Sequence, residues 1–245
     1  MRILLFLYSS LFIISCTTKQ FESTNNLSNN SLIIDSIEIT ERVDSVLFNA
    51  IIIPNGSYTS TKQSIKKWIG QGKHSGEDFE NYLVHYIIPY WYGTEWDFNG
   101  YTAVPNDGVI ACGYFVSTTL MHLGVKLDRY KLAQQAGLNE AKSLAILETK
   151  YETIWGIDKL KIALNDRYKD GIYFVGLDNH VGFLYIKKGT PYFIHSNYIE
   201  DRVMIEPALE ALAFQSNIYV VAELSTNEAL LEKWRKGEVV TVIRD

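Results

Sequence analysis

The sequence predicts an α+β protein in which N-terminal helices pack on an antiparallel sheet. Segments within residues 75–168 repeat apolar side chains at helical spacing, and residues 171–224 hold short strand-like runs separated by turns. Runs of helices followed by runs of strands are typical of α+β folds, whereas α/β folds alternate the two.

The composition is that of a globular protein. The chain has 245 residues, of which 47% are hydrophobic and 21% are charged. These fractions exclude a largely disordered protein, and the length is sufficient for one large domain with its own core. No internal repeat and no linker-like segment follows residue 31, so residues 32–245 are predicted to form a single domain. The net charge of −5 argues against a nucleic-acid partner, and nothing in the sequence indicates an obligate protein partner.

The first residues have the pattern of an export signal. Arg2 precedes an apolar run over residues 3–14, which is shorter than the ~20 residues of a membrane-spanning helix. The end of the run, Ile-Ile-Ser-Cys at residues 13–16, resembles the bacterial lipobox. That resemblance implies removal of residues 1–15 and lipidation of Cys16. The alternative is an ordinary signal peptide with an incidental cysteine.

A polar segment follows the predicted lipidation site. Residues 17–31 hold few aliphatic side chains, so they cannot bury enough apolar area to offset the entropy lost on ordering. Together with Cys16 they are predicted to form a tether over residues 16–31. We therefore expect an exported protein of the bacterial cell envelope that a lipid anchors to a membrane.

The first helices of the domain can be placed from their end signals. A helix is predicted to begin at Ser75 and to end at Pro89. Residues 90–108 combine glycine, proline and aromatic residues and are predicted to form a long ordered loop. Residues 109–123 are predicted to form a buried helix that Gly124 closes.

The later elements change from helical to strand periodicity. Two further helices are predicted over residues 132–145 and 157–168. Five strands are then predicted, over residues 171–177, 180–187, 191–198, 202–205 and 218–224. A last helix is predicted near residues 227–236.

Cys112 is the candidate nucleophile. It follows a glycine-containing loop and lies near the start of the helix predicted over residues 109–123. Free N–H groups and a partial positive charge at a helix start lower a thiol pKa, and the same N–H groups can hold an oxyanion. The alternative is a buried cysteine that only fills the core.

Two histidines lie on neighbouring predicted strands. If the turn between the strands is centred between Lys188 and Gly189, Gly182 lies opposite His195, and His180 is a diagonal neighbour on the same face. A turn centred one residue earlier would place the two histidines directly opposite each other, whereas a half-step shift would place them on opposite faces. The sequence thus predicts a contact between them that depends on this register.

A nucleophilic thiol needs an imidazole to accept its proton, and that imidazole needs a third group to orient it. Cys112, His180 and His195 are predicted to fill these roles, with Asn197 as the alternative third member. The remaining histidines, at positions 74, 85 and 122, show no helical metal-binding spacing. We therefore expect no metal and no cofactor.

Three segments resemble a known family. They are Ala-Cys-Gly-Tyr-Phe-Val at residues 111–116, His-Val-Gly-Phe at 180–183 and Phe-Ile-His-Ser at 193–196. Their order and content are similar to the NlpC-type papain-like cysteine peptidases, where the pattern is Asp-Cys-Ser-Gly-Phe-Val, then His-Val-Gly-Ile-Tyr, then a hydrophobic pair, His and a small residue. The loop over residues 92–100 is similar to the family's loop before the cysteine.

The resemblance implies a papain-like fold, with its catalytic core over about residues 80–224, and an endopeptidase or amidase of peptidoglycan. Tyr92 and Trp96 are expected to bind the substrate, and Tyr90 and Trp91 to line the groove with them. For these aromatic residues the alternative is a place in the core.

The sequence also departs from the family. Ala111 stands where the family has Asp, Gly113 stands where it has Ser, and a helical insertion over residues 125–168 lengthens the path to His180. The insertion is compatible with another acyl substrate, such as a lipid or a thioester. Two classes of function stay open: a cysteine hydrolase, and a non-catalytic envelope lipoprotein that uses the fold for binding. Rapid alkylation of Cys112 near neutral pH would favour the first.

Overall fold

The structure is a computed structural model, and it describes residues 56–244. The predicted signal peptide, Cys16 and the tether lie outside the described residues. The single domain predicted for residues 32–245 is therefore described from residue 56 onward. No helix within residues 56–244 is long and apolar enough to cross a membrane.

The strands of the described residues form one antiparallel sheet, as predicted. Its strands are β1 (Tyr151–Trp155), β2 (Gly171–Gly176), β3 (Val181–Lys187), β4 (Thr190–Asn197), β5 (Arg202–Pro207) and β6 (Ile218–Glu223). They lie in the order β1-β6-β2-β3-β4-β5, and every neighbouring pair is antiparallel. The α+β class is confirmed.

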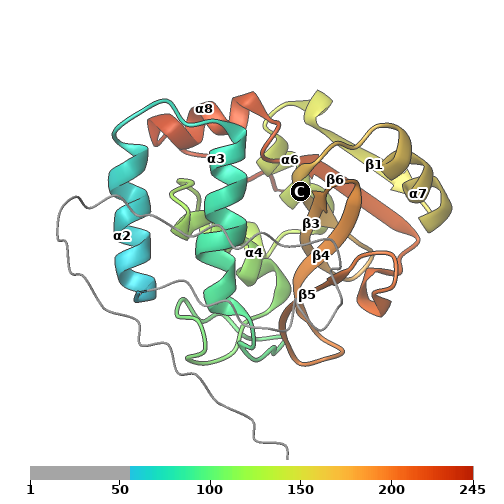
Figure 1. Cartoon of the computed structure of the whole chain (residues 1–245). Coiled ribbons are helices and arrows are strands. Elements are labelled where there is room, and N and C mark those ends of the chain that lie inside the picture. Colours follow the sequence, from blue (N-terminus) through green and yellow to red (C-terminus); the bar gives the residue numbers. More distant parts are fainter. Residues whose placement is uncertain (1–55, 245) are drawn as a thin grey trace, which may run out of the picture. The chain divides into compact units, whose positions relative to one another are not determined.

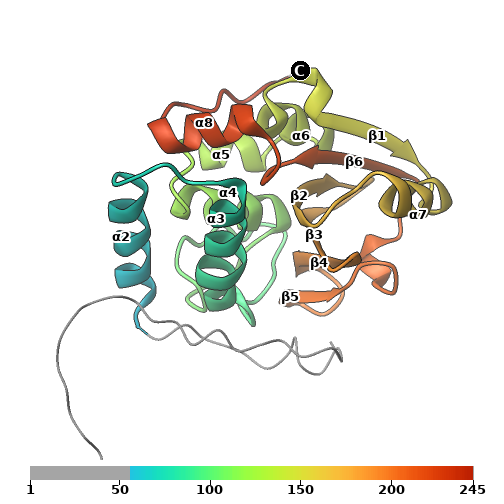
Figure 2. The same ribbon diagram turned by 45° about the horizontal axis from the view of Figure 1, so that its top comes forward.

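Helices cover both faces of the sheet. The α-helices are α2 (Tyr58–Ile69), α3 (Gly76–Asn81), α4 (Cys112–His122), α5 (Arg129–Ala133), α6 (Gly137–Ala145), α7 (Ile157–Asp166) and α8 (Glu228–Lys236). Short turns add η1 (Tyr82–Ile87), η2 (Ile88–Trp91), η3 (Glu148–Lys150) and η4 (Leu212–Phe214). Most of the helices gather on one side of the sheet, and α7 lies at the other (Figure 2).

Two separate cores follow from this arrangement. One is formed by helices α2–α6 and α8 with one face of the sheet, and it includes Trp91, Phe115 and Phe183. The other lies under α7 and η4 and includes Phe193 and Phe214. Strands buried on both faces explain why every residue of β2 is buried.

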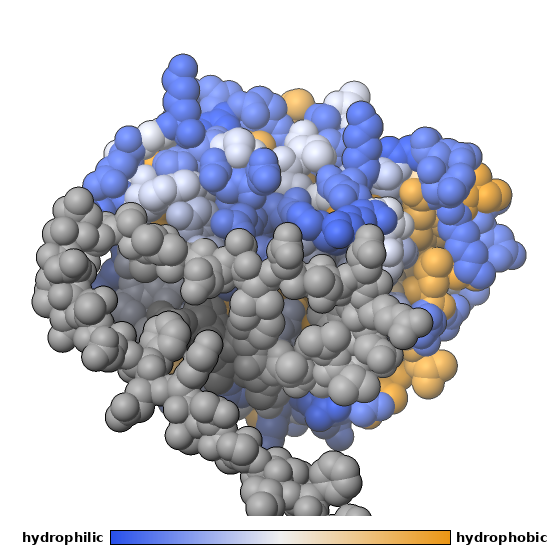
Figure 3. Space-filling view, in the orientation of Figure 1, coloured by the Kyte–Doolittle hydropathy of each residue, from blue (hydrophilic) through white to orange (hydrophobic). Residues whose placement is uncertain are grey.

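On the face that Figure 3 shows, most of the visible described surface is hydrophilic, and hydrophobic residues gather on the side where Figure 1 draws α7. Trp155 at the end of β1 and Ile162 in α7 belong to this part of the chain, and both are exposed.

The predicted helix boundaries hold in part. Ser75 caps α3 in a capping box with Asp78, as the sequence indicates. The helical path then continues through the π-helical η1 and the 3₁₀-helical η2, so it passes Pro89 instead of ending there. Proline is tolerated at this position because it lies in the first turn of η2, where its missing N–H needs no partner.

Other elements differ from the prediction. The helix predicted over residues 132–145 is two helices, α5 and α6. The helix predicted to begin at Val109 begins at Cys112, because Val109 and Ile110 form β-bridges with the preceding loop. Neither α2 nor β1 was predicted from the sequence.

The loop over residues 90–108 is ordered by backbone contacts, as predicted. The N–H of Gly93 donates to the carbonyl of Val203 at 2.9 Å, and that of Trp96 donates to the carbonyl of Asp201 at 3.0 Å. A Cβ on Gly100 would lie 2.6 Å from the backbone N of Ile110, so only glycine allows this close approach. The loop is thereby fixed against β5 and against the segment that leads to Cys112.

Candidate active site

Cys112 is the first residue of α4, with Ala111 as its N-cap. The helix packs against β3 and β4, so its start lies at the sheet. The hydroxyl of Ser196 in β4 donates to the carbonyl of Ile110 at 2.7 Å, which ties the segment before Cys112 to the strand that carries His195. The expected position of Cys112 at a helix start on the sheet is confirmed.

Burial of the thiol favours its neutral form. Burial raises the pKa of Cys112, and the charge of Glu140 acts in the same direction. The backbone N–H groups of Val181, Gly113 and Cys112 lower the pKa but do not outweigh burial. The expectation of a lowered thiol pKa was therefore wrong, because desolvation of the sulfur exceeds the effect of the helix start.

The hairpin of β3 and β4 has the register on which the histidine contact depends. Phe183 pairs with Ile194, which places Gly182 opposite His195. A Cβ on Gly182 would lie 2.9 Å from the Cβ of His195, so glycine leaves the space that the ring needs. Nε2 of His180 lies 2.7 Å from Nδ1 of His195, and the predicted contact is confirmed.

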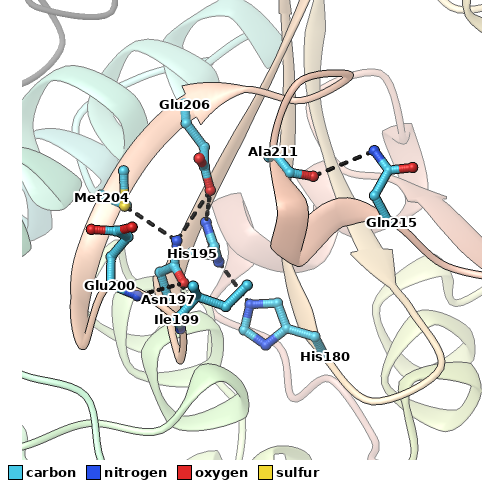
Figure 4. A network of polar contacts seen from close by, with 9 residues as sticks. All are labelled: His180, His195, Asn197, Ile199, Glu200, Met204, Glu206, Ala211 and Gln215. Atoms are coloured by element: carbon cyan, nitrogen blue, oxygen red, sulfur yellow. Dashed lines mark hydrogen bonds and ion pairs between the residues drawn. The ribbon is translucent and has the colours of Figure 1, made fainter.

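The hydrogen-bonded chain continues beyond His195. Its Nε2 lies 2.8 Å from Oε1 of Glu206 in β5, and the side-chain amide of Asn197 donates to the same oxygen at 3.2 Å (Figure 4). Oδ1 of Asn197 accepts from the backbone N–H groups of Ile199 and Glu200, which fixes the orientation of the amide. The ring of His180 thus bonds to His195, while Asn197 bonds to Glu206.

Burial keeps both histidines neutral near pH 7. It lowers the pKa of His195 to about 3, and it lowers that of His180 well below its ordinary value. Burial raises the pKa of Glu206, and the hydrogen bond from Asn197 opposes this rise. Neutral imidazole is the form that can accept a proton.

Two of the four aromatic residues expected in the groove lie in the core instead. Trp91 is fully buried, and its indole N–H donates to the hydroxyl of Tyr58 at 2.8 Å. Tyr90 is buried as well, with its hydroxyl 2.9 Å from that of Thr61. The groove prediction was wrong for both, because the 3₁₀ turn η2 directs them into the helical layer.

The other two aromatic residues differ from each other. Tyr92 is half-buried against the helical core, and burial raises its pKa. Trp96 is also half-buried, and its ring packs on Tyr198 with 6.2 Å between centroids. Tyr198 in turn meets His180 edge-on at 5.2 Å, so Trp96 is connected to the histidine through a second aromatic ring. Tyr198 was not predicted as a site residue from the sequence.

Glu140 in α6 is a second residue that sequence reasoning missed. Its side chain is buried, and Oε2 has no hydrogen-bond partner within the described part of the chain. Burial raises its pKa well above the ordinary value. Gly137, one turn earlier on α6, packs against Gly176 and Val181, and Val181 adjoins the thiol. The Glu140 side of α6 therefore lies toward Cys112.

Residues 56–244 contain no group of three or more His, Cys, Asp or Glu side chains arranged to hold a metal ion. Comparisons with protein-family models, with curated proteins and with solved structures found no match to this chain. A functional assignment therefore depends on the chemistry of the site itself.

Proposed function

We propose that this protein is a cysteine hydrolase with a papain-like fold, in which Cys112 is the nucleophile, His180 the general base and His195 the orienting residue. One observation supports this above others. His180 and His195 form a hydrogen-bonded pair of buried imidazoles, and His180 directly precedes Val181, whose backbone N–H contacts the thiol of Cys112. The packing of the cysteine-bearing helix α4 on β3 and β4 supports the papain-like assignment.

The proposed reaction begins from the neutral thiol. As Sγ of Cys112 attacks the substrate carbonyl, Nδ1 of His180 accepts the thiol proton, and an S–C bond forms. The N–H groups at the start of α4, which have no partner within the helix, stabilise the oxyanion. The C–N bond then breaks, and the leaving amine takes the proton from His180. Water, activated by His180, hydrolyses the thioester and restores the thiol.

The proposed substrates are peptide or amide bonds of peptidoglycan, which follows from the resemblance to the NlpC-type peptidases. Tyr92 and Trp96 are proposed to contact the substrate, and the ring of Tyr198 beside His180 extends this aromatic surface. Location in the cell envelope, with Cys16 lipidated, belongs to the same proposal. Cys16→Ser should release the protein from the membrane fraction, and equal fractionation of the two forms would contradict the anchor.

The function is tested by mass spectrometry of purified peptidoglycan incubated with the full chain and with Cys112→Ala. New fragments from the wild type and none from the variant would support the hydrolase. Lys188→Ala in the hairpin turn is a matched control, because its side chain is exposed and its backbone N–H contact to Asp170 is retained. Identical fragments from wild type and Cys112→Ala would contradict a nucleophilic role.

A second function is favoured by the state of the thiol. The raised pKa of Cys112 predicts slow alkylation near neutral pH, which is the behaviour expected of a non-catalytic envelope lipoprotein that binds peptidoglycan. Sedimentation with insoluble peptidoglycan separates the two. A binding module should sediment equally as wild type and Cys112→Ala, and neither form should release fragments.

A further inference from the structure

The two imidazoles of His180 and His195 can satisfy their mutual hydrogen bond in two ways. Either His180 donates from Nε2 to a bare Nδ1 of His195, or His195 donates from Nδ1 to a bare Nε2 of His180. A neutral imidazole carries one proton, so the choice at this bond also decides the state of the other nitrogen on each ring. Only the first arrangement leaves Nδ1 of His180 bare.

The carboxylate of Glu206 distinguishes these two arrangements. An ionised carboxylate only accepts hydrogen bonds, and its Oε1 lies 2.8 Å from Nε2 of His195. Nε2 of His195 must then carry the proton, and its Nδ1 is left to accept from His180. Asn197 donates to the same carboxylate oxygen, and its amide is held in that orientation by two backbone N–H groups, which reinforces the acceptor role.

From this geometry we infer that Glu206 is a positioning residue that sets the tautomers of both histidines through two successive hydrogen bonds. Glu206 selects Nε2–H on His195, His195 selects Nε2–H on His180, and Nδ1 of His180 stays bare. The inference rests on the proposed function only for its consequence, since a bare Nδ1 is what a thiol proton requires.

The surroundings of His195 and Glu206 are consistent with a positioning role for Glu206. The ring of His195 is fully buried and stacks on Phe193 at 4.0 Å, so it cannot obtain a replacement acceptor from solvent without rearrangement. The side chain of Glu206 is 20% exposed, which lets water stabilise its charge. Glu206 therefore lies at the solvent-exposed end of this series of hydrogen bonds, and His180 lies at the buried end.

Histidine tautomers can be read directly by ¹⁵N NMR of the full chain labelled at histidine, with assignments from single His→Gln variants. In the wild type we expect both His180 and His195 in the Nε2–H form. Glu206→Gln should keep this form, because the amide oxygen can still accept from His195. Glu206→Leu removes the acceptor and should populate Nδ1–H on both rings. Glu210→Gln, an exposed acid on the same segment, is the matched control and should change nothing.

Hydrolysis gives a second readout. Fragment release by Glu206→Leu should fall by about 10- to 100-fold, part of the contribution that general base catalysis makes. Glu206→Gln should lose less, and Glu210→Gln should match the wild type. If Glu206→Leu fails to fold, Glu206→Ala removes the acceptor with less apolar bulk at a partly exposed site.

The inference would be overturned by Nδ1–H on His180 in the wild type, or by unchanged tautomers in a folded Glu206→Leu or Glu206→Ala variant. A protein in which the tautomers shift as expected but no peptidoglycan fragment is released would uphold the role of Glu206. That result would instead contradict the proposed hydrolase, so the two failures are distinguishable.

Discussion

Two buried polar clusters contain histidine and share several properties. The helical cluster consists of Tyr58, Trp91 and His122. The sheet cluster consists of His180, His195 and Glu206. Nδ1 of His122 lies 2.8 Å from the hydroxyl of Tyr58, which also accepts the indole N–H of Trp91. Burial lowers the pKa of His122 to about 4, with the charges of Lys62 and Arg129 as further causes. His195 likewise combines burial, a short hydrogen bond and a lowered pKa.

The clusters differ in what lies at their ends. The Tyr58 hydroxyl accepts the indole N–H of Trp91 and shares a second hydrogen bond with Nδ1 of His122. That arrangement is complete and joins two helices. The chain on the sheet ends in an acceptor-only carboxylate at Glu206 and begins beside the strand residue that contacts the thiol. The two sites therefore share a low histidine pKa and differ in the groups that the histidine connects.

The largest effect is expected from removing the proposed nucleophile or the proposed base. Cys112→Ala and His180→Ala should each reduce fragment release from peptidoglycan to near background, and the double variant should be no worse. The losses do not add because nucleophile and base act as a unit. Full hydrolysis by a folded His180→Ala protein would remove the triad and favour the binding module.

The next largest effect is expected when one histidine of each cluster is substituted and the two variants are compared. His195→Ala should give an intermediate rate of fragment release, since His180 can still adopt the productive tautomer part of the time. His122→Gln should leave the rate at the wild-type value. Initial rates at matched protein concentrations measure both. A reduction in His122→Gln as large as that in His195→Ala would show that the two clusters are not functionally distinct.

The helical cluster should respond in stability instead. Tyr58→Phe leaves the Trp91 indole N–H and the His122 ring without their partner, and should lower the free energy of unfolding by about 1–3 kcal/mol. Denaturant unfolding measures this, with fragment release as the control that should stay unchanged. An unaltered unfolding midpoint would mean that the rings find other partners.

Acid should weaken the folded state through the same cluster. The pKa of His122 is lowered from 6.5 to about 4 on folding, so the unfolded chain binds the proton first as the pH falls. Stability is therefore lost as the pH falls from 6.5 toward 4. His180 and His195 act in the same direction, and the difference between the wild type and His122→Gln isolates one ring. We expect a smaller loss between pH 7 and pH 4 in the variant, measured by urea unfolding.

The smallest expected effect has the opposite sign. The pKa of Glu140 is raised on folding, so its contribution to stability is present at low pH and is lost as the pH rises above the ordinary carboxyl value. Glu140→Met replaces an unpartnered buried oxygen and should raise the free energy of unfolding at pH 7 by about 1 kcal/mol. The gain should shrink toward pH 4. A loss of stability at pH 7 would indicate that the carboxyl is satisfied.

Local patterns carry enough information to predict the hairpin but not the full chain of contacts. The alternation of β3 and β4 and the turn at Lys188 and Gly189 predict the His180–His195 contact for one turn position, and the register of the structure selects that position. Glu206 could not be found in this way, because its contact to His195 depends on the pairing of β4 with β5 and on the loop between them.

Helix periodicity was similarly limited. It does not reveal that Glu140 faces inward, since a glutamate in a predicted helix normally lies on the surface. It also does not reveal that Trp91 turns into the core, because that orientation comes from the 3₁₀ turn η2. The pKa of Cys112 was predicted with the wrong sign because burial is a property of the whole packed domain.

The bond from Ser196 to the carbonyl of Ile110 has a consequence for motion. It joins the strand carrying His195 to the backbone that leads into Cys112. A local opening that separates this strand from the loop would therefore displace His195 and Cys112 together. The two segments should therefore open as one cooperative unit, and β4 and the beginning of α4 should share the slowest amide hydrogen exchange.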